Sequence, residues 1–239
     1  YIVYREDDPD AEDGYRYYNG DAAADYEPNE DGIYEIADRL DWYKFAKKSK
    51  EDPTINGILT DDIDFSAVIS DKIGDYRIGE DDAYTGIFDG DGYTVSGLPQ
   101  MELPLFDTIG SGGELKNLTL SGATVNYISS TPAVGLVENN NGTVSGCAVS
   151  DITIIGSTSS AMIGTNRGTV TNCTATNITV AGKSAAAGIV YLNTGTIEKC
   201  NVVSGTVKAV HTENYDSHAG GICVRSGAGT IRECSNNAD

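Results

Sequence analysis

A short unit that recurs from residue 95 onwards constrains the fold more than any other feature of this 239-residue chain. In each unit an apolar residue is followed three positions later by Leu or Cys, at intervals of 20 to 34 residues. The six pairs are Val95/Leu98, Leu115/Leu118, Val144/Cys147, Val170/Cys173, Ile197/Cys200 and Ile231/Cys234. Val, Ile and Thr dominate, and a helical period of 3.6 is missing. The pattern is typical of short β-strands in a repeat protein.

Other positions recur in register with these pairs. A Gly-Thr dipeptide precedes each of the last four pairs, and an Asn stands two residues before the Gly in three of them. Each unit predicts an apolar triplet, a polar turn, a short strand, a further turn and another short strand. One unit cannot close a core, whereas stacked units can, because each strand pairs with its equivalent in the next coil. The sequence therefore predicts an all-β fold, a parallel β-helix with coils about 4.8 Å apart.

Four of the five cysteines share the repeat position that alternates with Leu. These are Cys147, Cys173, Cys200 and Cys234. We predict an inward stack of unpaired thiols, because a strand spacing of about 4.8 Å exceeds the mean Cβ separation of about 3.8 Å in a disulfide. A row of thiols also differs from the tetrahedron of a structural zinc site. By the same logic, the turn residues Asn140, Asn166 and Asn193 are expected to form a ladder of amide hydrogen bonds.

The N-terminal part departs from the repeat. Residues 1–32 form an acidic, Tyr-rich segment that we expect to be partly ordered, and residues 33–239 form the β-helix domain with its first strand at 33–36. A helix is predicted at about 38–50, with Asp38 as N-cap and an end before Pro53. We interpret Trp42 as part of a helical cap over the first coil, with a sugar-stacking platform as the alternative.

Two further segments precede the regular units. Residues 57–65 are expected to form one strand that carries three acids, and residues 86–95 a strand, a tight turn and a strand. The Asp-Gly-Asp-Gly run at 89–92 resembles the start of a calcium-binding loop but lacks the Glu required at the twelfth position, so a turn is the better interpretation.

The charge of the chain is −20 and is concentrated at one end. Residues 1–100 hold 26 acids and 9 bases, a net of −17, whereas residues 101–239 hold 10 acids and 7 bases, a net of −3. Such acidity argues against nucleic-acid partners and anionic membranes. No run of 18 apolar residues occurs, so we expect no membrane insertion. Solubility explains the acids, with weak Ca²⁺ binding as the alternative, and we expect no other cofactor.

The order of these motifs resembles that of a known family. The helix is followed by GILTDDIDFS, YTGIFDGDGYTVSGL and PLFDTIGSGGELKNLTLSG, and then by units such as GLVENNNGTVSGCAVSDITI. This is similar to bacterial extracellular proteins with GLUG-type repeats, including the repeats beside IgA1-protease-type peptidases, and the GLUG-type units span about residues 86–239. The resemblance implies a right-handed parallel β-helix that is secreted or attached to the cell wall, as part of a longer multidomain protein. The family's peptidase motif HExxH is absent here.

The expanded unit near the C-terminus holds both histidines and is the candidate ligand-contact loop. Its polar side chains are His211, Glu213, Tyr215, Asp216 and His218. A plain surface loop is the competing interpretation, and an adventitious metal site a further one. No catalytic motif is recognisable, so we expect a non-catalytic adhesion or spacer module that binds a host glycan or protein. The alternatives are a carbohydrate-active β-helix enzyme (a polysaccharide lyase or glycoside hydrolase) and an exosite domain of a larger secreted protease.

Overall fold

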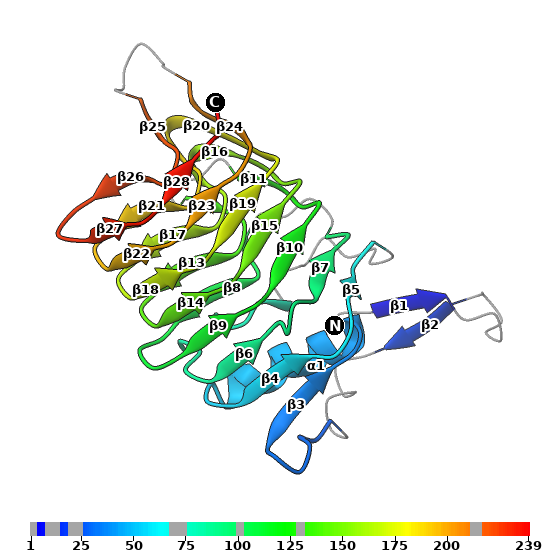
Figure 1. The fold of residues 1–239 in the computed structure, drawn as a ribbon. Coiled ribbons are helices and arrows are strands. Elements are labelled where there is room, and N and C mark those ends of the chain that lie inside the picture. The colour runs from blue at the N-terminus through cyan, green and yellow to red at the C-terminus, as the bar shows by residue number, and fades with distance from the viewer. Residues whose placement is uncertain are drawn as a thin grey trace.

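The computed structural model describes residues 4–7, 15–18, 26–66, 76–98, 103–127, 132–210 and 217–239, with side chains from residue 26 onwards. About half of the chain, 51%, is β-strand, and parallel sheets form a β-solenoid of about 6 turns with one short helix (Figure 1). The parallel β-helix predicted from the repeat is confirmed. Its handedness and the capping role of the helix stay predictions. Among the described residues, no helix has the length and apolar character needed to cross a bilayer.

Four parallel sheets run along the stack. The eight-stranded sheet contains β3 (Ile33–Ile36), β4 (Asn56–Leu59), β6 (Ile87–Asp89), β9 (Glu114–Lys116), β14 (Thr143–Ser145), β18 (Thr169–Thr171), β22 (Thr196–Glu198) and β27 (Thr230–Arg232). The seven-stranded sheet contains β5 (Ile63–Asp64), β7 (Thr94–Ser96), β10 (Thr119–Ser121), β15 (Ala148–Ser150), β19 (Thr174–Thr176), β23 (Asn201–Val202) and β28 (Ser235–Asn236).

The other two sheets complete each coil. The five-stranded sheet contains β8 (Phe106–Ile109), β13 (Val137–Asn140), β17 (Ile163–Asn166), β21 (Val190–Asn193) and β26 (Cys223–Ser226). The six-stranded sheet contains β11 (Thr124–Tyr127), β16 (Thr153–Ser160), β20 (Ile178–Ala187), β24 (Gly205–Ala209), β12 (Ala133–Val134) and β25 (His218–Gly220). A separate antiparallel pair, β1 (Tyr4–Asp7) and β2 (Tyr15–Tyr18), lies within the segment expected to be partly ordered.

Equivalent residues of successive coils lie side by side. In the eight-stranded sheet Val144 is in register with Leu115 on one side and Val170 on the other, and Val170 is in register with Ile197. These four side chains are fully buried. Each inward position therefore continues as a column along the solenoid, and the outward positions on either side carry polar residues such as Thr143.

The repeat unit predicted from the sequence lacks the strand that each coil contributes to the seven-stranded sheet. From β10 onwards the strands of this sheet start directly after the Leu/Cys position, because the chain turns a corner at the residue just before it. That residue has a positive φ of 53° at Asn117, 55° at Asn172, 54° at Lys199 and 53° at Glu233, and Gly146 takes the same place with 61°. The left-handed conformation bends the backbone within one residue, so no longer turn is needed.

The helix α1 (Arg39–Glu51) lies at the N-terminal end, as predicted. Asp38 is its N-cap, and the Asp38 carboxylate accepts a 2.9 Å hydrogen bond from the Asp41 N–H. Trp42 is fully buried, with ring centroids 6.1 Å from Phe65, 5.3 Å from Phe88 and 6.2 Å from Phe106, all edge to face. The interpretation of Trp42 as a core residue is confirmed.

The segments between the helix and the regular coils differ in part from the prediction. Residues 57–65 are not one strand, because the chain leaves β4 after Leu59 and enters β5 of another sheet at Ile63. Residues 86–95 do form strand, turn and strand. The Asp89 carboxylate of that turn accepts from the Asp91 N–H and the Asn117 side chain and lies 3.1 Å from the Lys116 ammonium. These internal bonds support a turn.

Candidate functional site

The four cysteines of the repeat stand in one column at the corner before the seven-stranded sheet. Cys147, Cys173 and Cys200 are buried, Cys234 is half-buried at the C-terminal end, and all five cysteines are free thiols. The Cys173 thiol lies 3.7 Å from the Val144 carbonyl oxygen of the preceding coil. Hydrogen bonding to Cys147 and burial raise the pKa of the Cys173 thiol. Cys173 is therefore a neutral core group and not a nucleophile.

The three asparagines form a hydrogen-bonded ladder at the ends of β13, β17 and β21. The Asn140 Nδ2 donates to the Asn166 Oδ1 at 2.8 Å, and the Asn166 Nδ2 donates to the Asn193 Oδ1 at 2.8 Å. All three side chains are fully buried. Asn140 Oδ1 also accepts from the Gly142 N–H at 3.2 Å, which ties the ladder to the turn. The ladder satisfies buried polar groups of three coils at once.

Replacing Asn166 with Ala is expected to lower the free energy of unfolding by about 2–4 kcal/mol, because the buried amides of two neighbours lose a partner. Urea denaturation followed by circular dichroism measures the effect. Asn139→Ala is the matched control, since Asn139 is half-buried in β13 and its change is expected to cost less than about 0.5 kcal/mol. Equal costs for the two variants would contradict a stabilising ladder.

Of the five side chains predicted to contact a ligand, only that of His218 lies within the described residues. His211, Glu213, Tyr215 and Asp216 lie outside the described residues. His218 lies in β25, in register with Ala185 of β20, and is exposed. Its backbone is therefore part of the six-stranded sheet, and ligand contact by the five side chains stays a prediction.

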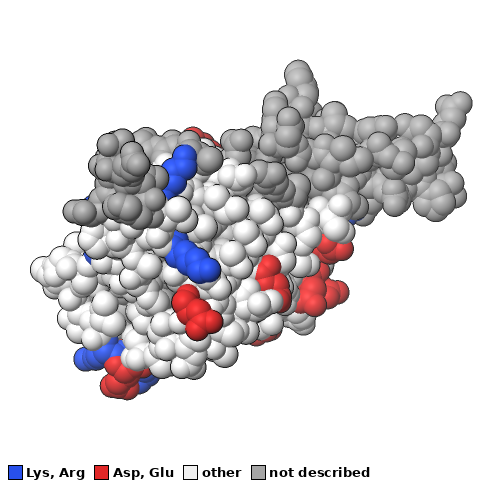
Figure 2. All heavy atoms as spheres, turned by 90° about the horizontal axis from the view of Figure 1, so that it is seen from above, with Lys and Arg blue, Asp and Glu red and all other residues white. Residues whose placement is uncertain are grey.

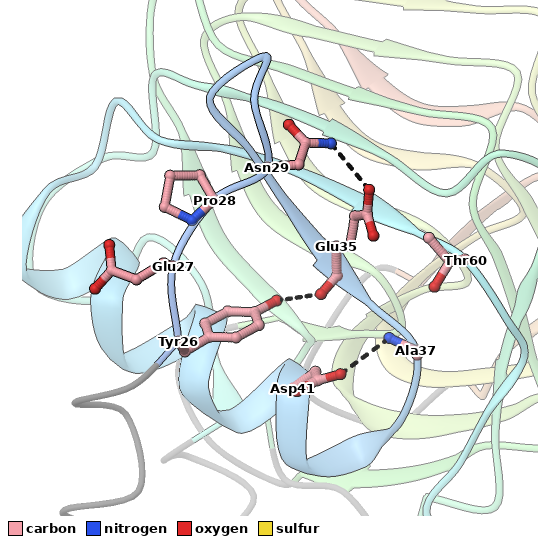
Figure 3. A pocket seen from close by; sticks show the side chains of 8 residues that line it. All are labelled: Tyr26, Glu27, Pro28, Asn29, Glu35, Ala37, Asp41 and Thr60. Carbon is pink, nitrogen blue, oxygen red and sulfur yellow. Dashed lines mark hydrogen bonds between the residues drawn. The ribbon is translucent and has the colours of Figure 1, made fainter.

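A pocket of about 350 Å³ lies beside the helix, where the repeat has not yet begun. Figure 3 shows the eight side chains that line it, which come from residues 26–29, the end of β3, the first turn of α1 and the residue after β4. The parallel pairing of β3 with β4 brings Glu35 and Thr60 to the same mouth. Sequence reasoning missed this pocket, although it lies in the acidic part of the chain.

Internal hydrogen bonds hold the pocket in shape. The Tyr26 hydroxyl donates to the Glu35 carbonyl oxygen at 2.6 Å, and the Asn29 Nδ2 donates to the Glu35 carboxylate at 2.9 Å. The Asp41 carboxylate accepts from the Ala37 N–H at 3.3 Å. Burial raises the pKa of the Tyr26 hydroxyl above its usual range, and the nearby Asp41 carboxylate acts in the same direction. Tyr26 is therefore a neutral, fixed donor.

Carboxylates dominate the pocket mouth. Lys48 lies 3.6 Å from the Glu27 carboxylate and Lys44 lies 3.2 Å from that of Asp41, while the Glu35 carboxylate bonds to the neutral amide of Asn29. The mouth thus combines acceptors, an amide and the hydroxyl of Thr60 around a volume within the range of small-ligand pockets. Such groups suit a ligand that is rich in hydroxyl groups or a ligand that carries a positive charge.

A buried arginine joins carboxylates on two adjacent coils. Arg77, with a side chain 4% exposed, donates from Nη2 to Asp107 on β8 at 2.5 Å and to Glu138 on β13 at 3.2 Å. Burial raises the pKa of Glu138, and the Asp107 charge acts in the same direction. A close carboxyl pair is what glycoside hydrolysis requires. One guanidinium bonds to both carboxylates, so the pair also forms an ion-pair network that fastens Arg77 to the coils.

Within the part of the chain that the structure describes, no group of three or more His, Cys, Asp or Glu side chains is placed to hold a metal ion. Comparison of the chain with protein-family models, with curated proteins and with solved structures found no match.

Proposed function

We propose that this chain is a non-catalytic extracellular adhesion or spacer module of a bacterial surface protein that binds a host glycan or protein. The observation that supports it most is that the recurring side chains have structural partners. The Val, Ile and Leu columns are buried, the Cys column fills a corner, and the Asn column is hydrogen-bonded to itself. A stack of this regularity is a stiff unit that suits a spacer.

The surface supports binding rather than reaction chemistry. Figure 2 shows a face on which uncharged side chains predominate between scattered charged ones. Polar groups converge on the pocket beside α1, where carboxylates, an amide and a hydroxyl meet. The resemblance to GLUG-repeat surface proteins supports an extracellular location, secreted or attached to the cell wall. We therefore assign the ligand contact to this pocket, and we expect a glycan because carboxylate and amide groups bond readily to hydroxyls.

Binding of the chain to an array of host glycans and to purified host surface proteins tests this proposal. A Glu35→Gln variant removes one carboxylate of the pocket but keeps an acceptor for Asn29, and it is expected to weaken glycan binding about tenfold or more. Glu30→Gln is the matched control, because Glu30 is exposed on the same segment and does not line the pocket. Equal binding by the wild type and both variants would remove the pocket from the proposal.

The carbohydrate-active enzyme is the second candidate, and the Asp107–Glu138 pair is the observation that favours it. Release of reducing ends or unsaturated sugars from pectin, mucin glycans and host polysaccharides measures that activity. Turnover that is abolished by Glu138→Gln, while the variant keeps the melting temperature of the wild type, would replace the adhesion proposal with a hydrolase or lyase. No turnover in either protein is the result that the adhesion proposal expects.

A further inference from the structure

One carboxylate of the pocket beside α1 lacks a cation. The carboxylates of Glu27 and Asp41 lie 3.6 and 3.2 Å from a lysine ammonium. The Glu35 carboxylate bonds through one of its two oxygens to the neutral amide of Asn29, and among the described residues no lysine or arginine forms an ion pair with it. The lining of the pocket therefore carries a negative charge that a cationic ligand would neutralise.

The surroundings of the pocket are also negative. Residues 26–66 hold 11 acids and 5 bases, a net of −6. Burial raises the pKa of the Tyr26 hydroxyl, and the charges of Asp41, Asp38 and Glu35 act in the same direction. Negative potential thus converges on a hydroxyl that lines the pocket. Such a potential attracts a cationic ligand and repels sialylated or sulfated glycans.

A hydroxyl without a partner lines the pocket together with the free carboxylate oxygen. Figure 3 shows Glu35 of β3 and Thr60, which follows β4, on the wall that these two strands form. Within the described part of the chain the Thr60 hydroxyl has no hydrogen-bond partner, so it can donate and accept. A simple amine would leave this hydroxyl unused, and a neutral sugar would leave the carboxylate without a cation. An ammonium group beside hydroxyl groups satisfies both.

We propose that the pocket binds a sugar that carries a free, protonated amino group, such as a glucosamine unit without an N-acetyl group. This inference rests on the assignment of glycan binding to the pocket and narrows it. The ammonium of the sugar pairs with the Glu35 carboxylate, and a neighbouring hydroxyl of the sugar bonds to the Thr60 hydroxyl. Acetylation removes the positive charge of an amine, so an N-acetylated sugar loses the ion pair.

Titration calorimetry of the whole chain with two oligosaccharides of equal length, one of glucosamine and one of N-acetylglucosamine, tests the proposal. The wild type is expected to bind the glucosamine oligosaccharide at least about tenfold more tightly while its amines are protonated. Glu35→Gln should reduce this preference to less than about threefold. Glu30→Gln is the matched control, because it removes the same charge outside the pocket and should keep the preference.

The outcomes separate this inference from the glycan proposal. Equal affinity of the wild type for the two oligosaccharides would overturn the inference alone, whereas a chain that binds no glycan would overturn both. A preference that survives in Glu35→Gln, or that is lost equally in Glu30→Gln, would also overturn the inference. So would a lysine amide that binds as tightly as the glucosamine oligosaccharide, because the hydroxyl groups would then contribute nothing.

Discussion

Replacing Cys173 with Asp is expected to lower the free energy of unfolding by about 4 kcal/mol at pH 7. The side chain is fully buried between the Cys147 and Cys200 side chains of adjacent coils. Burial of this kind raises a carboxyl pKa by about 3–5 units, so the carboxyl is largely protonated in the folded state at pH 7. The cost at pH 7 is then about 1.4 kcal/mol for each of the roughly 3 pH units between the pKa of the unfolded chain and pH 7. The cost approaches the lower end of the stability of an ordinary domain. Thermal and urea unfolding measure it.

The same column supplies the control for the Cys173 variant. Cys234 holds the equivalent position but is half-buried at the open end, so Cys234→Asp is expected to cost less than half as much. Because the buried carboxyl has a raised pKa in the folded state, the penalty should shrink as the pH falls towards about 4, where the carboxyl of the unfolded chain also protonates. An unchanged melting temperature for Cys173→Asp would show that the thiol faces outwards.

Replacing Trp42 with Ala is expected to cost about 3–5 kcal/mol, since truncation of a buried Trp removes a large apolar surface and leaves a cavity. The ring contacts three aromatic side chains of the first coils, and its Nε1 donates to the Tyr76 carbonyl oxygen at 2.9 Å. Urea denaturation of the wild type and the variant measures this cost by circular dichroism.

Trp42→Phe separates packing from hydrogen bonding at this position. Phe keeps an aromatic ring but leaves the Tyr76 carbonyl oxygen without this donor, so the expected cost is about 1–3 kcal/mol. A loss below about 1 kcal/mol for Trp42→Ala would contradict the view that α1 closes the first coil. A loss confined to the helix signal, with intact sheets, would show that the coils fold without it.

The repeat columns could be predicted because each structural role recurs with the same residue type. The Leu/Cys position from Leu118 onwards, the Asn before Gly-Thr and the cap at Asp38 all lie where the pattern indicates. The first predicted pair, Val95/Leu98, is wrong, because Val95 pairs with Leu120 of the seven-stranded sheet and it is Phe88 that pairs with Leu115. The corner between the eight- and seven-stranded sheets could not be predicted in the same way. Lys199 and Glu233 adopt a positive φ there, and nothing in these residue types signals a left-handed conformation.

The pocket depends on long-range pairing that no local pattern encodes. Tyr26, Glu35, Asp41 and Thr60 come together only because β3 pairs with β4 and α1 folds back beside them. The Arg77 network is a similar case, since Asp107 and Glu138 are 31 residues apart in sequence and meet through the register of β8 and β13. Single positions within one repeat were predictable, whereas sites that join the repeat to its irregular beginning were not.

The constant register of the coils also has a kinetic consequence. The asparagine ladder joins residues 26 and 27 positions apart, and the corner thiols of Cys200 and Cys234 are 34 positions apart. Each coil therefore closes a loop of similar length wherever it lies in the stack, and the entropy of loop closure does not grow with the number of coils. The rate of adding a coil should stay nearly uniform along the chain, with the first coil and its helix as the slow nucleus.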